Sequence, residues 1–437
     1  MKEKLLRMIR EGSLVCGVVG LGYVGLSLAL ALARAGFRTI GFDVRPDRVK
    51  RLREGKADPE DGACDALEAL VACQKLSATG AFQQLSEVDF IAICVPTPLD
   101  PYGQPDLQCL REAAQAIAGQ LRPGMAVVLE STSYPGTTEE LLRPLFEQGS
   151  GLRCGEDFFL GCAPERVDPG NRLFCTENTP RVVGGIGSEA TTVIAALYRA
   201  VIRGEVREVS RPSVAEMEKL LENSYRNVNI ALANEMALVC DTMGIDIWEV
   251  VDAAATKPYG FVPFYPGPGV GGHCIPVDPA YLSWRARGFG CRTPLLETAA
   301  QINDRMPEYC AARAARLLNA SGKPVAGSKI LALGAAYKQE VADCRESPAI
   351  RVMELLRAQG ASLTFYDPYV RQYAWQGKIR RGSGRLSAGA VARADLVLIL
   401  TAHRAVDYQL VQKRARRILD TKNAMKGIEP RDNITLL

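Results

Sequence analysis

Residues 15–44 read VCGVVGLGYVGLSLALALARAGFRTIGFDV, and this stretch decides the fold. An apolar run predicts a strand, and it ends in a G-x-G-x-x-G pattern made by Gly20, Gly22 and Gly25. A long apolar helix is expected to follow and to stop at Gly36, before a second strand that ends in Asp43. The order strand, glycine turn, helix, strand and acid predicts the start of a doubly wound α/β domain.

The glycine pattern in this context predicts a dinucleotide site, because glycines let the backbone approach a pyrophosphate at a helix N-terminus. Asp43 lies 18 residues after the last glycine, where a carboxylate would bind the ribose hydroxyls of NAD and repel the extra phosphate of NADP. We therefore expect NAD as the cofactor. The alternative is a glycine turn that only packs a helix on a sheet. The candidate cofactor-binding residues here are Gly20, Gly22, Tyr23, Val24, Gly25, Asp43 and Arg48.

The bulk composition fits an ordinary globular protein of two or three domains, with 437 residues and 47% hydrophobic residues. The 53 basic and 49 acidic residues leave a net charge of +4, too balanced to argue for a nucleic-acid or membrane partner. The charged N-terminus does not read as a signal peptide, so we expect a cytoplasmic protein. The 13 cysteines include no C-x-x-C pair, which predicts neither a disulfide framework nor a metal site.

Two further apolar runs end in loops rich in Pro and Thr, at DFIAICVPTPL (89–99) and MAVVLESTSYPGTT (125–138). Loops after parallel strands gather at the ligand-binding edge of a doubly wound sheet. Thr97 and Thr132 are therefore candidates to face the cofactor. The alternative is that their hydroxyls only cap turns.

The C-terminal part repeats this plan loosely. A strand and turn at 328–338, a helix at 350–360 and a strand ending in Asp367 precede ADLVLILTAHRAV (394–406). The phosphate-binding glycines are reduced to Gly-Ala-Ala, so this part predicts a second Rossmann-type unit without the dinucleotide pattern, suited to a smaller nucleotide. The predicted class is α/β, with two Rossmann-like doubly wound domains joined by a long central helix and a helical dimerisation region.

Residues 212–245 predict that central helix, with a capping box of Ser213 and Glu216 and a C-terminal stop at Gly244. One predicted apolar stripe consists of Val214, Met217, Leu220, Leu221, Val228, Leu232, Met236 and Val239. A polar face repeats every four residues at Lys219, Asn223 and Asn227. This face is either functional or simply solvated.

The stretch from 257 to 279 is so rich in Pro and Gly that no regular helix or strand is expected in it. An irregular loop of this length is typical of a binding or active site. Its Cys274 is a buried apolar residue, a metal ligand or a nucleophile. Without a Cys/His cluster around it the nucleophile is favoured, with Asp278 and Lys219 as candidates to activate the thiol.

These motifs resemble the UDP-glucose/GDP-mannose dehydrogenase family, in the family's order and over nearly the whole chain. They are GLGYVGLSLA, CVPTPL, ESTSYPGTT, APERVDPGN, EKLLENSYRNVNIALANE, GPGVGGHCIPVDP and YKQEVADCRESPA. The resemblance implies an NAD-binding domain at 1–210, a central helical region with the Cys loop at 211–320, and a UDP-sugar-binding domain at 321–437. It also implies a homodimer through the central helix.

The resemblance implies a four-electron oxidation of a UDP-sugar at the 6-hydroxyl through a Cys274 thiohemiacetal and thioester, in surface polysaccharide synthesis. The GGHC sequence is similar to the branch acting on UDP-N-acetylhexosamines, and the longer stretch TKPYGFVPFYPGPGVGGHCIP is most similar to UDP-N-acetylglucosamine 6-dehydrogenases. The alternatives are UDP-N-acetylmannosamine, UDP-N-acetylgalactosamine and UDP-glucose. More remote alternatives are a 3-hydroxyacid dehydrogenase and a non-enzymatic nucleotide-sensing module.

The resemblance also assigns residues. Lys219 and Asn223 would hold the reacting oxygen, Asp278 would assist the thiol or a water, and Glu165 with Thr132 would serve thioester hydrolysis. Arg345 would lie near the cofactor. The implied substrate-binding residues are Glu165, Arg166, Val167, Lys219, Asn223, Tyr259, Phe264, Tyr265, Gly267, Gly271, His273 and Lys338. In one departure, the Asp-rich stretch usual after Lys338 has an alanine and a glutamate at two acidic positions.

Overall fold

The structure is a computed structural model that describes residues 1–58, 66–168, 171, 173–272 and 274–437. The chain forms two compact units, each with its own parallel sheet. The first unit contains residues 1–222 and 280–292, and the second contains residues 223–279 and 293–437. The predicted three-part division of the chain stays a prediction.

The first unit is built on an eight-stranded sheet in the order β3-β2-β1-β4-β5-β6-β7-β8, parallel except where β7 pairs with β6. Its strands are β1 (Val15–Val19), β2 (Arg38–Phe42), β3 (Leu76–Thr79), β4 (Phe90–Ile93), β5 (Ala126–Leu129), β6 (Phe159–Cys162), β7 (Arg181–Gly185) and β8 (Val206–Val209). The strand order reverses direction beside β1, because β2 lies on one side of it and β4 on the other. Ligands of such sheets bind at this switch point.

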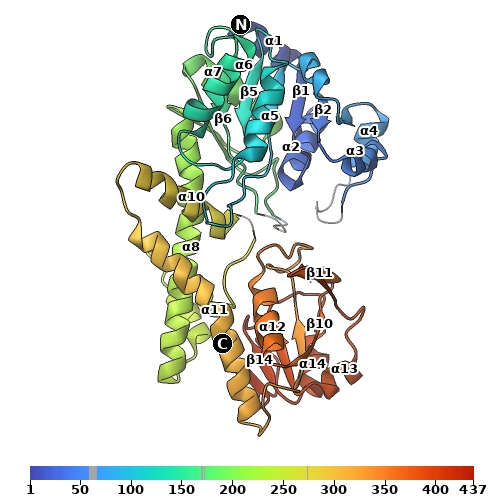
Figure 1. Cartoon of the computed structure of the whole chain (residues 1–437), viewed down its shortest axis with the longest axis vertical. Coiled ribbons are helices and arrows are strands. Elements are labelled where there is room, and N and C mark those ends of the chain that lie inside the picture. Colours follow the sequence, from blue (N-terminus) through green and yellow to red (C-terminus); the bar gives the residue numbers. More distant parts are fainter. Residues whose placement is uncertain (59–65, 169–170, 172, 273) are drawn as a thin grey trace. The chain divides into compact units, whose positions relative to one another are not determined.

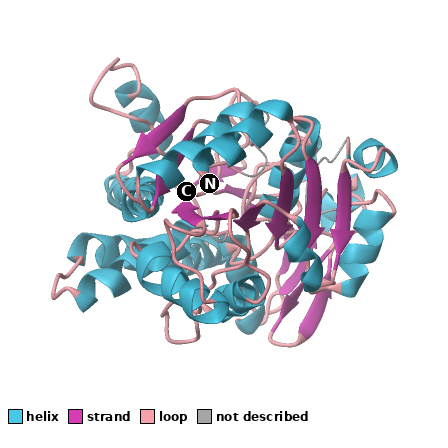
Figure 2. Ribbon diagram, turned by 90° about the horizontal axis from the view of Figure 1, so that it is seen from above, coloured by secondary structure: helices cyan, strands magenta, loops and turns pink. Residues whose placement is uncertain are grey.

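Helices cover both faces of this sheet (Figures 1 and 2). One face packs against α1 (Lys2–Glu11), α2 (Tyr23–Arg34), α3 (Pro46–Arg53), α4 (Leu67–Ala72) and α7 (Ser188–Val201). The other packs against η2 (Phe82–Glu87), α5 (Gln108–Ala118), the π-helix η3 (Thr137–Leu142) and α6 (Arg143–Ser150). The predicted strand–turn–helix–strand at the start of the chain is confirmed, and Gly36 ends α2 with a φ of 101°.

The long helix α8 (Pro212–Met243) confirms the predicted central helix and its stop, since Gly244 has a φ of 69°. The predicted capping box is wrong. Glu216 instead turns inward, where it accepts hydrogen bonds from the backbone N–H of Gly136 (2.6 Å) and from the N–H (2.9 Å) and hydroxyl (2.6 Å) of Thr138. Its carboxylate therefore holds the start of η3 rather than the start of its own helix.

The predicted apolar stripe on α8 is corrected at Leu220, which is fully buried, whereas Leu221 is 60% exposed. The exposed apolar residues of the helix are Val214, Met217, Leu221, Tyr225, Leu232, Met236, Val239 and Met243. The predicted polar face lies on the opposite, buried side, with Lys219, Asn223 and Asn227 each no more than 6% exposed. Buried polar side chains need hydrogen-bond partners, so this face is not a solvated surface.

The second unit adds α9 (Ile247–Ala254) and α11 (Pro294–Asn319), while α8 and α10 (Cys274–Gly288) contribute residues to both units. The prediction that 257–279 contains no helix is wrong for its last six residues, because α10 begins at Cys274 and includes Pro276 and Pro279. A proline in a helix's first turn breaks no hydrogen bond, since N–H groups there have no partner inside the helix. Pro276 satisfies this condition.

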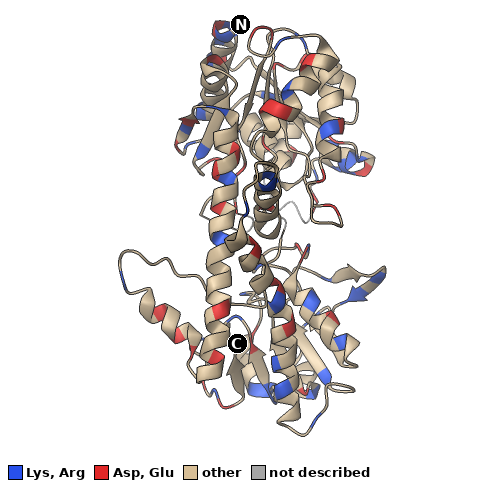
Figure 3. Cartoon of the chain, turned by 60° about the vertical axis from the view of Figure 1, so that its left-hand side comes forward, with Lys and Arg blue, Asp and Glu red and all other residues tan. Residues whose placement is uncertain are grey.

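The second sheet is parallel throughout, in the order β10-β9-β13-β14-β15. Its strands are β9 (Lys329–Leu333), β10 (Ser362–Tyr366), β13 (Leu396–Ile399), β14 (Ile418–Asp420) and β15 (Ile434–Leu436). One face packs on α11 and α12 (Pro348–Ala358), the other on α13 (Ala388–Arg393) and α14 (Tyr408–Arg414). A separate hairpin of β11 (Gln372–Trp375) and β12 (Lys378–Arg381) is basic, as Figure 3 shows.

At the position that corresponds to Asp43, the second sheet has Asp367, whose carboxylate is bound by its own turn and by a histidine. The Oδ2 atom of Asp367 accepts hydrogen bonds from Ala335 N (2.7 Å) and Ala336 N (3.0 Å) and contacts His403 Nε2 at 3.0 Å. Because the N–H of Glu340 donates to His403 Nδ1, the imidazole proton lies on Nε2 and is donated to Asp367. These bonds hold the pKa of Asp367 near 2, against the effect of burial.

The predicted fold class is confirmed, with a Rossmann-like N-terminal domain, a long central helix and a second parallel-sheet domain. Over the described residues, every helix is too short or too polar to cross a bilayer.

We expect the stability of the fold to depend on the ionisation of Glu216. Burial raises the pKa of Glu216 to about 7, so the folded chain keeps a proton that the unfolded chain releases above its ordinary value of 4.5. The stability that this proton provides is complete below pH 4.5 and is lost as the pH rises through 7. Glu216→Gln replaces one of the two accepting oxygens by a donor, a cost that does not change with pH. The difference in stability between Glu216→Gln and the wild type should therefore shift by ~2 kcal/mol in favour of the variant from pH 5 to pH 8 in urea unfolding.

The control for this measurement is Glu235→Gln, on the exposed side of the same helix. Its stability should follow the wild-type pH profile. Parallel profiles for Glu216→Gln and the wild type would contradict the expectation.

Candidate active site

The glycine turn after β1 has the geometry of a dinucleotide site. Gly20 has a φ of 89°, and an added Cβ there would lie 2.6 Å from the carbonyl oxygen of Cys94. A Cβ on Gly25 would lie 1.8 Å from the carbonyl oxygen of Gly20. Packing therefore requires these two glycines. An added Cβ on Gly22, in contrast, would have no atom within 4 Å. The glycine at this position is better explained by the need to keep open the approach to the N-terminus of α2, where Tyr23 and Val24 lie.

Asp43 lies at the carboxyl end of β2, where its carboxylate accepts hydrogen bonds from Leu21 N (3.0 Å) and Arg45 N (2.9 Å). It also lines a cavity of about 510 Å³ with Val44, Pro46, Val49, Lys50, Arg53, Glu54 and Gly80. An acid beside a cavity at the carboxyl ends of β2 and β3 fits the adenosine half of NAD. Arg48 is absent from this cavity. Its guanidinium is buried and pairs with Asp58 at 3.4 Å, which argues against the predicted contact with the cofactor.

The two predicted threonines join neighbouring loops at the sheet edge. The hydroxyl of Thr97 donates to the carbonyl oxygen of Thr132 at 2.7 Å, and Thr97 is buried. This bond ties the loop after β4 to the loop after β5. The hydroxyl of Thr97 is therefore engaged with the protein, as the turn-capping alternative expected, while Thr132 is half-buried and stays a candidate.

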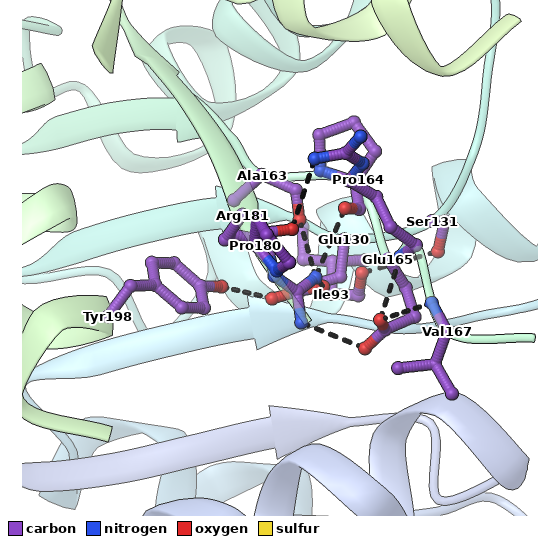
Figure 4. Close-up of polar contacts among 11 residues, drawn as sticks. Ile93, Glu130, Ser131, Ala163, Pro164, Glu165, Val167, Pro180, Arg181 and Tyr198 are labelled. Atoms are coloured by element: carbon purple, nitrogen blue, oxygen red, sulfur yellow. Dashed lines mark hydrogen bonds and ion pairs between the residues drawn. The ribbon is translucent and has the colours of Figure 1, made fainter. Parts of the chain in front are cut away.

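Glu165 belongs to a buried ionic cluster in the first unit (Figure 4). Arg181 donates to Glu130 Oε2 (2.7 Å) and to Glu165 Oε2 (2.9 Å), and its guanidinium also contacts the carbonyl oxygens of residues 163 and 164. The hydroxyl of Tyr198 bonds to the other oxygen of Glu130. Glu165 Oε1 accepts the backbone N–H groups of Arg166 (2.7 Å) and Val167 (2.9 Å).

The cluster separates the ionisation of its two carboxylates. Burial raises the pKa of Glu130 to about 7, against the attraction of Arg181. Burial acts on Glu165 in the same direction, but Arg181 and the two backbone N–H groups hold its pKa below the ordinary value. A carboxylate with a lowered pKa is a weaker base. This favours a charged, orienting role for Glu165, while its predicted role as a base stays a prediction.

The remaining predicted catalytic residues lie on α8 and α10. The side-chain N–H of Asn223 donates to Asp278 Oδ2 at 2.5 Å, and both residues are buried. Lys219 lies one helical turn before Asn223 on the same face of α8. Cys274 is exposed, as the first residue of α10, and lies four residues before Asp278. A helix N-terminus favours negative charge, so this placement suits a thiolate.

The Gly/Pro loop before Cys274 packs tightly against the second unit's own residues. An added Cβ on Gly271 would lie 2.7 Å from Pro348, and one on Gly272 would lie 2.8 Å from the ring of Tyr337. Tyr265 stacks on Trp248 with ring centroids 5.5 Å apart. Phe264 packs edge-on against Tyr225 at 5.8 Å, while Tyr259 is 72% exposed. Gly271 and Gly272 are thus required by packing.

The other substrate candidates lie at the β9–α12 connection. Lys338 is partly exposed, and the exposed guanidinium of Arg345 pairs with Asp343 at 2.7 Å. Glu340, one of the departures from the family pattern, accepts the backbone N–H of Arg404. His273 lies outside the described residues. The guanidinium of Arg166 pairs with Glu218 and Glu222. Its contact with a predicted catalytic residue is made by the backbone, because the N–H of Arg166 donates to Glu165.

Sequence reasoning missed several buried polar residues of this region. They are Glu130, Arg181, Tyr198, Asn234 and Asn303. Glu130 directly follows strand 126–129, and a carboxylate at the carboxyl end of a buried strand could have indicated a functional residue. Asn234 continues the polar face of α8 by seven residues beyond Asn227. Arg181 and Asn303 gave no local signal.

The glycine turn, the cavity at Asp43 and the polar face of α8 define a dinucleotide-binding α/β oxidoreductase. Three domain descriptions of one family match the chain in order: the NAD-binding domain at 14–202, the central domain at 213–305 and the UDP-binding domain at 331–427. The chain therefore belongs to the UDP-glucose/GDP-mannose dehydrogenase family. It is an NAD-dependent nucleotide-sugar dehydrogenase with a UDP-binding domain.

Similar proteins support this assignment. The chain is 38% identical to a UDP-N-acetyl-D-glucosamine 6-dehydrogenase of Pseudomonas aeruginosa, over 81% of this chain and 82% of the relative. It is 36% identical to a UDP-N-acetyl-D-mannosamine dehydrogenase of Pyrococcus horikoshii, over 94% and 95%. A solved UDP-D-ManNAc dehydrogenase structure from Pyrococcus horikoshii superposes with a TM-score of 0.87 at 33% identity, covering 97% of this chain and 98% of that one.

Two glycines of the turn should respond oppositely to alanine. Gly25→Ala places a methyl group 1.8 Å from a carbonyl oxygen and should destabilise the protein by ~3 kcal/mol or more. Gly22→Ala meets no protein atom, so its melting temperature should equal that of the wild type. Its affinity for NAD⁺ should fall at least ~10-fold in calorimetry, because the methyl group enters the space where the pyrophosphate approaches the backbone. Normal NAD⁺ binding by Gly22→Ala would contradict this use of the turn.

Proposed function

We propose that the chain oxidises the primary alcohol at the 6-carbon of a UDP-N-acetylhexosamine to a carboxylate, in surface polysaccharide synthesis. The placement of Cys274 supports this proposal most directly. The thiol is exposed at the first residue of α10, one turn before an aspartate that Asn223 holds by a hydrogen bond. A dehydrogenase that stops at an aldehyde has no use for a thiol in this position.

The proposed reaction balances as one alcohol, two NAD⁺ and one water giving one acid, two NADH and two protons. Bound NAD⁺ supplies the hydride acceptor in both oxidations. The alcohol first loses a hydride and its hydroxyl proton to give an aldehyde. The sulfur of Cys274 adds to the aldehyde carbon, and loss of a second hydride from the thiohemiacetal leaves a thioester. Water then breaks the carbon–sulfur bond and releases the acid and the thiol.

The roles of the other residues follow from their chemistry. Lys219 and Asn223, one turn apart, would donate hydrogen bonds to the oxygen on which charge develops. Asp278 would orient the thiol or a water together with Lys219. Glu165 would hold the hydrolytic water with Thr132. We further propose that the Gly/Pro loop and Lys338 bind the UDP group, since a lysine point charge suits a diphosphate.

UDP-N-acetylglucosamine is the first choice of substrate, because the GGHC sequence and the Pseudomonas aeruginosa relative point to it. UDP-N-acetylmannosamine is the second choice, as the substrate that the name of the Pyrococcus horikoshii relative gives. A panel of these two with UDP-N-acetylgalactosamine and UDP-glucose, followed by NADH absorbance, ranks them by kcat/KM. The proposal fails if none yields two NADH per sugar.

Replacing the thiol tests the covalent step. We expect Cys274→Ser to abolish formation of the uronic acid, because a serine hydroxyl does not form the thioester that water cleaves. The measurement is the acid formed per UDP-sugar, by mass spectrometry. Cys291→Ser, which changes another exposed cysteine, is the matched control and should retain activity. Full turnover to acid by Cys274→Ser would overturn the covalent mechanism.

We also propose that the chain forms a homodimer through α8. The exposed apolar stripe runs along a helix of 32 residues, and a two-fold axis would bury it against the same stripe of a second copy. The double variant Leu221→Glu with Leu232→Glu should sediment as a monomer with unchanged circular dichroism, because both side chains are more than half exposed within one chain. Unchanged dimer mass in the variant, or a monomeric wild type, would contradict this interface.

A further inference from the structure

Amide side chains that the proposed chemistry does not use hold the backbone on both sides of Cys274. Before the cysteine, the backbone N–H of Gly267 donates to Asn234 Oδ1 at 2.9 Å. After it, the carbonyl oxygen of Ile275 accepts the side-chain N–H of Asn227 at 3.2 Å. Both asparagines lie on the buried face of α8 and are no more than 2% exposed.

A third asparagine connects the two anchors. Asn303 of α11 accepts the side-chain N–H of Asn234 at 2.9 Å and donates its own to the backbone oxygen of Asn227 at 3.1 Å. Donors and acceptors therefore alternate without conflict from Gly267 through Asn234 and Asn303 to Asn227. Because each amide group has one donor end and one acceptor end, this chain of bonds allows one orientation of the Asn234 and Asn303 side chains.

The Asn227 bond also explains how α10 accommodates Pro279. A proline lacks the N–H that would bond to the carbonyl oxygen four residues earlier, and for Pro279 that oxygen belongs to Ile275. Asn227 supplies the missing donor to that oxygen. The side chain thus completes the first turn of the helix whose first residue is Cys274, and a frayed turn would lose the favourable field at the thiol.

The loop has little structure of its own to replace these anchors. Gly269 and Gly272 have φ values of 125° and 83°, which few other residues adopt, and the described residues 257–272 form neither helix nor strand. Gly272 N donates to the carbonyl oxygen of Arg345 at 3.2 Å, a bond to another loop. A segment without internal regular structure keeps its position through the groups around it.

We propose that Asn227, Asn234 and Asn303 are positioning residues for Cys274, fixing the loop and the first turn of α10 so that the thiol has one location. This proposal rests on the proposed role of Cys274 as the nucleophile. Neutral amides suit the task, because they hold the backbone on both sides of the sulfur without adding a charge that would alter a thiolate.

The test compares isosteric variants of the full-length protein. Asn234→Leu keeps the volume and removes both hydrogen bonds, whereas Asn234→Asp keeps an acceptor for Gly267. Asn227→Leu removes the bond to Ile275. The matched control is Asn229→Leu on the same helix, since the side-chain N–H of Asn229 donates to the carbonyl oxygen of Tyr225 within α8. Melting temperatures report whether each variant folds.

The first readout is the rate at which iodoacetamide alkylates Cys274, measured by peptide mass spectrometry against exposed Cys109 and Cys291 in the same sample. We expect Asn234→Leu and Asn227→Leu to slow alkylation of Cys274 about fivefold relative to these two, as loss of a helix-terminus interaction implies. Hydrogen exchange of peptides covering 267–275 should accelerate. The kcat should fall about 100-fold while the KM for NAD⁺ stays within about twofold.

Asn234→Asp restores the acceptor for Gly267 but places an acceptor against Asn303 Oδ1 and adds a negative charge, so it should recover only part of the Cys274 reactivity. A general loss of stability would predict no recovery. The proposal is overturned if Asn234→Leu and Asn227→Leu match Asn229→Leu in relative alkylation and in exchange of 267–275. If Asn234→Leu does not fold, Asn234→Asp and Asn227→Leu decide by the same comparison. A failure of the proposed function can be distinguished from a failure of this proposal. It would show as full acid formation by Cys274→Ser, whatever the results for the asparagine variants.

Discussion

The buried polar face of α8 is the constraint on which the reactive part of this protein depends. An amide without a partner in the protein interior costs about 1–3 kcal/mol, so a helix that buries several asparagines is stable only where other groups meet them. Here the groups that meet Asn223, Asn227 and Asn234 belong to one irregular segment and the start of the helix after it. The side-chain N–H groups of Asn223 and Asn227 and the Oδ1 of Asn234 thus find partners in that segment and that helix start.

The two parallel sheets use the same aspartate differently. Asp43 and Asp367 both follow the second strand of a strand–helix–strand unit, and both accept backbone N–H groups of the preceding turn. Asp43 also faces a cavity, whereas Asp367 gives its remaining capacity to buried His403 and to the N–H groups of Tyr369 and Val370. One scaffold thus yields an aspartate that lines a cavity and one whose carboxylate binds its own turn and a histidine.

Local patterns in the sequence predicted most of the fold. The glycine turn, the stop at Gly36 and the repeated strand–helix–strand near the C-terminus depend on neighbouring residues, and all are confirmed. The prediction of a capping box was wrong because Glu216 binds the start of η3, which lies about 80 residues away in sequence. The start of α10 was not predicted because Asn227, distant in sequence, donates the hydrogen bond that Pro279 cannot supply. The Glu130–Arg181–Glu165 cluster joins three separate segments, which no pattern within one segment reveals.

The spacing of the outer side chains of α8 has a consequence for its shape. The apolar positions 214, 217, 221, 225, 228, 232, 236, 239 and 243 repeat every eleven residues, with steps of three, four and four. This period corresponds to about 3.67 residues per turn, close to that of an undistorted α-helix, so it imposes no left-handed supercoil. A heptad seam would rotate the opposite face steadily along the axis. In α8, Asn223 and Asn234 are one eleven-residue repeat apart, so their amides lie on nearly the same side of the helix.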